Sequence, residues 1–179
     1  TGHGTTAGSD VLGAQLGVQA QNIHLDSRIA LASGAFKATA EDSVTLGTHA
    51  DLDLSGRKVT LMDVEKYSWG GDVELAADSG DVVAEAGSRI DVSARNNRGG
   101  RISVTALGEG AGPVNLAATL LGQGSGRYDA GGSRVPFDGG ELFVRAQSLQ
   151  DFAGLNQRLT EGGITGTRSF QLKQGDLVV

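Results

Sequence analysis

The strongest constraint on the fold is a short motif that recurs along the chain. Each copy has an apolar residue, a small or acidic residue, a second apolar residue and then small residues. The copies occupy residues 27–34, 50–56 and 88–94. Their first apolar positions, Ile29, Leu52 and Ile90, are 23 and 38 residues apart. A repeat on the order of 20 residues is typical of solenoid proteins. We therefore expect the first interval to be one turn, and the second to be two tight turns or one turn with an insertion.

Runs of about four residues that alternate apolar and polar side chains lie between these motifs. They occupy residues 22–25, 43–46, 58–61, 72–75, 81–84, 101–104, 113–116 and 141–144. A period of two is typical of a strand with one buried face, and the Gly, Asp, Ser and Asn residues around the runs favour turns. Apolar residues make up 39% of the chain but aromatic residues only 4%, which suits a narrow core of stacked aliphatic side chains. The sequence therefore predicts an all-β protein.

The arrangement that we expect is a right-handed parallel β-helix, a solenoid in which each strand pairs with its copy one turn away. The inward valines and leucines of such a stack form aliphatic ladders. A β-sandwich or an up-and-down barrel also uses many short strands. Those folds need tight hairpins, yet the Asn-Gly or Asp-Gly signal of such a turn occurs only at Asp138-Gly139. The repeat and the scarcity of hairpin signals favour the β-helix.

Two loop insertions are expected to interrupt the repeat. Residues 62–70 contain the only Met and the only Trp of the chain, and residues 122–140 are rich in glycine without an apolar period. Both segments are predicted to protrude from the stack. We expect residues 1–18 to be a poorly defined N-terminal segment, and residues 19–147 to form the strands of the β-helix with these two insertions.

One short amphipathic helix is predicted within residues 148–163. Its apolar face has the i, i+3, i+7 spacing of a helix and consists of Phe152, Leu155 and Leu159. Ser148 is a candidate N-cap, and Gly162-Gly163 would end the helix. We expect this helix to lie against the stack, and residues 164–179 to form further strands that continue the solenoid.

The composition excludes several classes of site and partner. The chain has no cysteine, which rules out disulfides, zinc–thiolate sites and thiol catalysis. Its net charge of −6 is spread along the chain without a basic run, so no nucleic acid partner is expected. No segment approaches the roughly 20 apolar residues that span a bilayer, and no signal peptide is visible at the start. We expect the sequence to be a fragment of a longer chain.

An enzyme has to be weighed, because polysaccharide-degrading enzymes also use parallel β-helices. The polygalacturonase type needs clustered aspartates, usually an adjacent pair, and no Asp-Asp occurs here. Gly2-His3-Gly4 matches a short piece of that family's pattern but has no partners around it. His24 and His49 are isolated in the sequence and are expected to be exposed. We therefore expect no catalytic residue and no enzymatic activity.

A metal site is the other chemical alternative, because oxygen-rich turns suit Ca²⁺. The carboxylates in question lie within twenty residues and are Asp72, Glu74, Asp78, Asp81, Glu85 and Asp91. However, the glycine-rich nonapeptide of calcium-binding β-rolls is absent. Aspartates at strand ends more often close turns by accepting hydrogen bonds from backbone amides. We expect no bound metal and no cofactor.

The candidate ligand contacts are aromatic residues in or beside the two insertions. They are Tyr67, Trp69, Tyr128 and Phe137. Aromatic rings combine a large apolar surface with defined geometry, which suits stacking on sugars and anchoring of interfaces. The alternative for Trp69 is that it covers the core where the first insertion leaves the stack.

Three repeats resemble those of filamentous haemagglutinin-type exoproteins. They occupy residues 70–77, 80–94 and 99–106. A more specific likeness to the same family lies in the runs 151–156, 162–170 and 175–177. The resemblance covers most of the chain from about Gln19 onward. It implies a secreted bacterial protein of the two-partner secretion type, located at the cell surface and exported by an outer-membrane β-barrel transporter. Such proteins form long fibres that attach to host cells, to other bacteria or to matrix polysaccharide.

One departure from the family pattern limits which part of such a protein this is. The secretion domain of the family contains Asn-Pro motifs, whereas the only prolines here are Pro113 and Pro136 and neither follows an asparagine. We therefore expect a structural or adhesive segment outside the secretion domain. The alternatives are a polysaccharide-binding module and a polysaccharide-degrading enzyme on the same fold.

The expected partners follow from this interpretation. They are the outer-membrane transporter and a glycan or protein receptor on a host cell or in the matrix. A β-helix cut across also exposes unpaired strand edges, which invite pairing with another chain. We expect the ends either to be covered by loops or by the helix, or to associate end to end with another copy.

Overall fold

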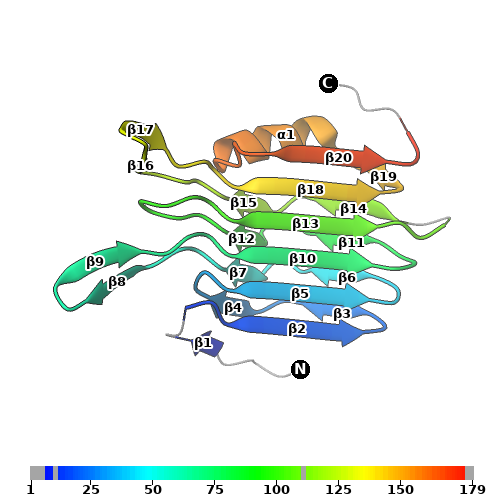
Figure 1. Ribbon diagram of the computed structural model, residues 1–179. Helices are drawn as coiled ribbons and strands as arrows, with labels where there is room; N and C mark the ends of the chain where they lie inside the picture. Colours follow the sequence, from blue (N-terminus) through cyan, green and yellow to red (C-terminus); the bar gives the residue numbers. More distant parts are fainter. Residues whose placement is uncertain (1–6, 10–11, 110–111, 176–179) are drawn as a thin grey trace.

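The computed structural model describes residues 7–9, 12–109 and 112–175, and this part of the chain is mostly β structure in parallel sheets (Figure 1). Sheet A contains, in spatial order, β1 (Ala7–Ser9), β4 (Arg28–Leu31), β7 (Asp51–Asp53), β12 (Arg89–Asp91) and β15 (Thr119–Leu121). Sheet B contains β2 (Gln15–Ala20), β5 (Ala35–Ala40), β10 (Asp72–Ala77), β13 (Arg101–Ala106), β18 (Glu141–Ala146) and β20 (Arg168–Leu172). Sheet C contains β3 (Ile23–Leu25), β6 (Val44–Leu46), β11 (Val82–Ala84), β14 (Pro113–Leu116) and β19 (Ser148–Leu149). The all-β class predicted from the sequence is confirmed.

Consecutive strands visit the three sheets in a fixed order. The chain passes from β2 in sheet B to β3 in sheet C and β4 in sheet A, and then returns to sheet B at β5. The same order recurs as far as β19, apart from two insertions. Each strand therefore pairs in parallel with the strand that occupied the same sheet on the previous visit, as β5 does with β2 and β6 does with β3.

The inner faces of the sheets carry columns of stacked apolar side chains. One column of sheet B consists of Phe36, Val73, Ile102 and Leu142, which lie directly opposite one another and are each at most 1% exposed. A column nearer sheet C consists only of alanines, Ala40, Ala77, Ala106 and Ala146, each at most 2% exposed. Because each visit adds an apolar side chain at the same position, and because one whole column consists of alanines, the core stays narrow and needs few aromatic rings.

The recurring motif of the sequence corresponds to one column of sheet A. Leu52 lies opposite Ile29 on one side and opposite Ile90 on the other, and Leu120 follows Ile90. All four side chains are buried. The interval of 38 residues between Leu52 and Ile90 is therefore one turn with an insertion, and the alternative of two tight turns is wrong.

Both insertions are antiparallel hairpins rather than irregular loops. The first hairpin pairs β8 (Lys58–Leu61) with β9 (Val64–Tyr67), and the second pairs β16 (Arg127–Ala130) with β17 (Ser133–Pro136). The expectation that residues 58–61 form a strand of the stack is therefore wrong, and the first insertion begins before residue 62. The turns of the two hairpins lie at Met62-Asp63, with φ angles of 44° and 65°, and at Gly131-Gly132, with φ angles of 67° and 93°. Left-handed backbone at both central residues is the turn that suits the twist of a hairpin. Asp138-Gly139, the hairpin signal noted in the sequence, does not form either turn.

The predicted helix is α1 (Phe152–Glu161), and it begins later than the proposed cap. Asp151 is the N-cap, because its Oδ1 accepts a hydrogen bond from the Gly154 N–H at 3.1 Å. Ser148, the cap expected from the sequence, lies in β19 instead. Gly162 is the C-cap, as expected, and its N–H donates to the Arg158 carbonyl.

Helix α1 takes the place of a strand of sheet A. It follows β19 of sheet C, precedes β20 of sheet B and lies over β15, the last strand of sheet A (Figure 1). Its Leu155 and Leu159 are fully buried and belong to the same core cluster as the sheet residues. The Gly122 N–H, directly after β15, donates to the Gly162 carbonyl at 2.8 Å. The helix therefore covers the edge of sheet A that would otherwise be open.

The first strands of the stack are less well covered. β2 begins at Gln15, within the segment expected to be poorly defined, and its outer edge has no strand partner among the residues that the structure describes. Leu12 and Leu16 are 40% and 37% exposed. Gly2-His3-Gly4 and residues 176–179 lie outside the described residues. Within those residues no helix is both long and apolar enough to cross a membrane.

Two buried carboxylates explain the small residues that end the recurring motif. Asp53 and Asp91 are only 8% and 6% exposed. Each accepts a hydrogen bond of 2.6 Å from the hydroxyl of the serine two residues later, Ser55 or Ser93. Arg28 adds a 3.0 Å ion pair to Asp53. An ionised carboxylate at such a depth is stable because its oxygens have these partners.

Candidate functional site

Both hairpins emerge at the corner where sheet A passes into sheet B. The connections at this corner are residues 32–34, 54–71, 92–100 and 122–140, and the hairpins project from the second and the fourth (Figure 1). The corners that lead into and out of sheet C have no comparable insertion among the described residues before β19. The two breaks in the repeat, which are far apart in the sequence, therefore border one region of the surface.

Glycine pairs form the floor of this corner. Gly70-Gly71, Gly99-Gly100 and Gly139-Gly140 precede β10, β13 and β18. A Cβ atom on Gly70 would overlap the carbonyl oxygen of Val92, and one on Gly100 would overlap that of Gly71. The backbones of successive visits thus approach too closely for any side chain. The surface at this corner lies at the level of the main chain, as glycines in strands often indicate.

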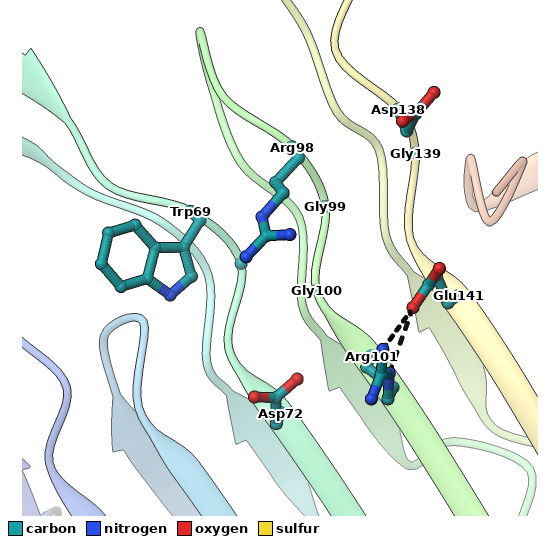
Figure 2. Close-up of a pocket in the computed structure, with 10 residues that line it drawn as sticks. Trp69, Asp72, Arg98, Gly99, Gly100, Arg101, Asp138, Gly139 and Glu141 are labelled. Carbon is teal, nitrogen blue, oxygen red and sulfur yellow. Dashed lines mark hydrogen bonds and ion pairs between the residues drawn. The ribbon is translucent and has the colours of Figure 1, made fainter. Parts of the chain in front are cut away.

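A groove of about 330 Å³ lies over these glycines. Its aromatic and charged lining consists of Trp69, Asp72, Arg98, Arg101, Asp138 and Glu141. Figure 2 shows Trp69 and Arg98 at one side of the groove and Arg101 with Glu141 at the other. Trp69 follows the first hairpin and Asp138 follows the second, while Arg98 comes from the connection between them. The groove therefore brings together three separate connections of the chain.

Hydrogen bonds fix the backbone that presents Trp69. The Ser33 hydroxyl donates to the Trp69 carbonyl at 2.6 Å. The neighbouring Ser68 is buried, and its N–H donates to the Arg57 carbonyl at 2.9 Å. Trp69 as a residue is nevertheless 52% exposed. Trp69 is therefore held rigidly by its main chain and presents its ring to solvent, rather than covering the core.

A row of alternating charges crosses the groove. Asp72, Arg101 and Glu141 are the first residues of β10, β13 and β18 and lie directly opposite one another. Arg101 donates from Nε and from Nη2 to the same Glu141 oxygen, at 3.1 and 3.0 Å. Its guanidinium also lies 5.2 Å from the centre of the Phe143 ring, a cation–π contact that limits its movement. Arg101 and Glu141 therefore offer a donor and an acceptor in fixed positions, beside the exposed carboxylate of Asp72.

The four predicted aromatic residues do not form one site. Trp69 lines the groove, whereas Tyr67 is half-buried at the base of the first hairpin, where its carbonyl accepts a 2.8 Å hydrogen bond from the Asn97 side chain. Tyr128 and Phe137 pair with each other on the second hairpin, with ring centres 5.1 Å apart. That pair stabilises the hairpin and does not line the groove.

Sequence reasoning missed the charged residues of the groove. Arg98, Arg101, Asp138 and Glu141 belong to different connections and strands, so no local motif contains them. One signal was present, because Gly-Gly is followed directly by a charged residue at Asp72, Arg101 and Glu141. Asp72 and Arg101 are 29 residues apart, whereas Arg101 and Glu141 are 40 apart because the second hairpin lies between them, so the three sites show no constant spacing in the sequence.

The two histidines are exposed, as predicted, but His49 is not isolated. Its backbone N–H donates to Asp26 at 2.8 Å and holds the pKa of that carboxyl below its usual value. Its Nδ1 lies 3.2 Å from Asp26 and also 3.2 Å from the Thr48 hydroxyl. A hydroxyl–histidine–carboxylate relay needs the two partners on different ring nitrogens. Both contacts here use Nδ1, so this cluster does not have catalytic geometry.

The carboxylates considered for calcium serve other contacts or point to solvent. Asp81 accepts a hydrogen bond from the Gly112 N–H, Asp91 is bonded to Ser93 and Arg89, and Asp72 lies in the groove. Among the described residues no group of three His, Asp or Glu side chains is arranged to hold a metal ion.

Comparison of the chain with protein-family models, with curated proteins and with solved structures finds no match.

Proposed function

We propose that the chain winds as a right-handed parallel β-helix and serves as a structural and adhesive segment of a secreted bacterial surface exoprotein. The observation that supports this most directly is the fixed order in which the strands visit three parallel sheets, with every pairing in register. Such a stack adds about 4.8 Å of length per turn. Its buried columns make it rigid. Its stability is approximately the sum of the stability of each turn and of the contacts between neighbouring turns, so the stability rises with the number of turns.

The separation of core and protrusions supports an adhesive role. The inner columns are uniform, whereas the hairpins and the groove all lie at one corner. A segment of this design presents side chains along one line of a rod, and many such segments in a fibre multiply a weak contact. The partners of this proposal are a host-cell or matrix receptor and, for export, an outer-membrane transporter of the two-partner type.

End-to-end association belongs to the same proposal. The helix covers sheet A at one end, whereas the exposed Leu12 and Leu16 lie at the other, beside the edge of β2 that has no strand partner among the described residues. Exposed strand edges pair readily with other chains. Sedimentation of the chain over a range of concentrations is expected to show reversible dimers, and Leu16→Lys is expected to weaken them. A strict monomer at all concentrations would contradict this part of the proposal.

Two experiments test the fold and the adhesive role. Beads coated with the chain are expected to attach to host cells, to bacteria or to matrix-coated surfaces more than beads coated with the heat-denatured chain. Attachment that does not exceed this control on any surface would contradict the adhesive role. A crystal structure tests the handedness, because a left-handed path from sheet B through sheets C and A would overturn the right-handed β-helix.

A polysaccharide-binding module is the second candidate, and one specific observation favours it. Trp69 holds its ring half in solvent beside a row of fixed charges over a main-chain floor. Sugar-binding sites combine an apolar platform with a few placed hydrogen-bonding groups. The two candidates are compatible, because an adhesin can attach through a glycan.

A further inference from the structure

We propose that the groove between the two hairpins binds an uncharged polysaccharide chain, with one sugar ring stacked on Trp69 and its neighbours hydrogen-bonded to the row Asp72, Arg101 and Glu141. This inference deepens the proposed adhesive function, on which it rests for its biological role. It concerns the ligand class and the residues that select it.

The first argument is the solvent exposure of the Trp69 side chain. A tryptophan that completes a core is mostly buried, yet this residue is 52% exposed while its main chain is fixed by Ser33 and Ser68. The exposed part of the indole presents apolar surface whose removal from water is favourable. The C–H groups on the flat face of a pyranose carry a slight positive charge, which matches the negative face of the ring system. A sugar ring is thus the flat, partly polar group that this ring suits.

The second argument is the shape of the surface under the groove, which consists of glycine backbone. The glycine pairs that precede β10, β13 and β18 have no side chains to rise above the backbone there, and at Gly70 and Gly100 an added Cβ would overlap a neighbouring carbonyl. An extended polymer can therefore lie flat across three strands. With strands about 4.8 Å apart, the distance from Asp72 to Glu141 is on the order of 10 Å. That length corresponds to about a disaccharide beside the ring that stacks on Trp69.

The third argument is the pattern of hydrogen-bonding groups. Asp72 and Glu141 accept, Arg101 donates, and all three lie in one row because their strands are in register. Neighbouring hydroxyls of a sugar both donate and accept, so one ring can bond to a carboxylate and to a guanidinium at once. The Arg101–Glu141 bonds and the Phe143 contact hold two of the three side chains in place before a ligand arrives, which lowers the entropy cost of binding.

The fourth argument is the charge balance of the groove, which favours uncharged sugars over polyanions. The groove contains three carboxylates, Asp72, Asp138 and Glu141, against two guanidinium groups. Arg101 is already paired with Glu141. The chain as a whole has a net charge of −6. A polyanion would therefore meet an excess of negative charge, and like charges across an interface oppose binding.

The chain supplies its own reporter for the test, because Trp69 is its only tryptophan. Indole fluorescence is followed while the intact chain is titrated with uncharged oligosaccharides (β-1,4-glucan, β-1,3-glucan, mannan and chitin fragments), and separately with oligogalacturonate. Calorimetry repeats each titration without the reporter. We expect saturable quenching or a blue shift with at least one uncharged ligand, and weaker or no response to oligogalacturonate at the same ionic strength.

The variants locate the site. Trp69→Ala is expected to weaken binding in calorimetry by about tenfold or more, as for removal of an aromatic anchor, and Trp69→Tyr to restore part of it. Asp72→Asn keeps the shape of the row and is expected to weaken binding several-fold. Tyr128→Ala, on the second hairpin outside the groove, is the matched control and is expected to leave the affinity unchanged.

The outcomes separate this inference from the proposed function. Tighter binding of oligogalacturonate, no binding of any uncharged ligand, or binding unaffected by Trp69→Ala would each overturn the inference. If coated beads nevertheless attach to cells or matrix, the adhesive function stands through another surface. If the uncharged sugar binds at Trp69 but the beads attach to nothing, the inference stands and the adhesive function fails.

Discussion

Leu52 of β7 lies directly opposite Ile90 of β12, although 38 residues separate them in the sequence. The pairing is possible because the first hairpin lies wholly outside the stack. At its base the Ser68 N–H donates to the Arg57 carbonyl at 2.9 Å, and the Arg57 N–H donates to the Ser68 hydroxyl at 2.7 Å. The hairpin is therefore connected to the stack through Arg57 and Ser68, which are hydrogen-bonded to each other.

Replacement of residues 58–67 by Asn-Gly is expected to leave the fold intact. Arg57 and Ser68 already form the hydrogen-bonded pair that flanks a two-residue turn, and Asn-Gly suits such a turn. The free energy of unfolding should change by less than about 1 kcal/mol, since no core residue is removed. Circular dichroism and thermal melting measure this. Loss of a cooperative transition would show that the hairpin is part of the folding unit.

Leu52→Ala is expected to destabilise the protein by about 2–5 kcal/mol, the usual cost of a cavity in a packed core. Leu52 is fully buried between its neighbours on both sides. Leu16→Ala is the matched control, because the same side chain there is 37% exposed, and its cost should be below about 1.5 kcal/mol. Urea denaturation gives both values. Equal costs for the two variants would argue against a core built from columns in register.

Gly100→Ala is expected to destabilise the stack by about 1–3 kcal/mol or more, because an added methyl group must push two backbones apart. Its Cβ would overlap the Gly71 carbonyl. At Gly17 nothing lies within 4 Å of an added Cβ, so Gly17→Ala should be neutral or stabilising by up to about 1 kcal/mol. Denaturation of the two variants side by side tests the close approach of the backbones. If Gly100→Ala proves as stable as Gly17→Ala, the main-chain floor of the groove is not as described.

Acid is expected to weaken the protein partly through Asp53. Burial alone would raise the pKa of this carboxyl, but the hydrogen bonds from Ser55 and Arg28 and the charge of Arg57 more than offset it and lower the pKa below 3.8. A carboxyl with a lowered pKa in the folded state adds stability that is complete above the unfolded value. That stability is lost as the pH falls through the folded value.

Asp53→Asn isolates this contribution. The difference in unfolding free energy between the wild type and Asp53→Asn should be constant from about pH 6 to 5 and should shrink below about pH 4, where the carboxyl of the unfolded chain becomes protonated. Chemical denaturation at a series of pH values measures it. A difference that grows on acidification would mean that the pKa of Asp53 is raised instead.

Asp151→Ala is expected to cost about 0.5–2 kcal/mol, the usual effect of losing an N-cap. The residue also has a positive φ of 49°, which alanine tolerates poorly. Asp151→Asn should retain most of the stability, because asparagine accepts the same hydrogen bond and adopts left-handed backbone readily. Equal losses in the two variants would show that the carboxylate acts through its charge, for instance on Arg158, which lies 3.3 Å away.

The fold was largely predictable because the core is repetitive. The recurring motif indicates one column, which consists of Ile29, Leu52 and Ile90. The alternation of apolar and polar residues indicates most strands of the parallel sheets. The hairpins were predicted only as protruding loops, since Met62-Asp63 lacks the glycine that usually marks a two-residue hairpin turn. The Gly131-Gly132 turn had a signal that was overlooked.

The groove was predictable only in part. Trp69 stood out as the single tryptophan, within the insertion expected at residues 62–70, with covering of the core as the alternative. Arg98 and Asp138 are ordinary charged residues in the sequence, 40 residues apart, and only the stacking of the connections brings both to the groove. A site made from several turns has no local motif, so it becomes visible once the register is known.

The corner between sheets A and B has a consequence for how such a chain can change. The length of a connection at that corner does not enter the register, because Leu52 meets Ile90 across a hairpin as directly as it meets Ile29 across a short turn. Segments there can be lengthened, shortened or exchanged between relatives without disturbing the columns. The stability of the columns and the shape of the surface at this corner can therefore change independently of each other.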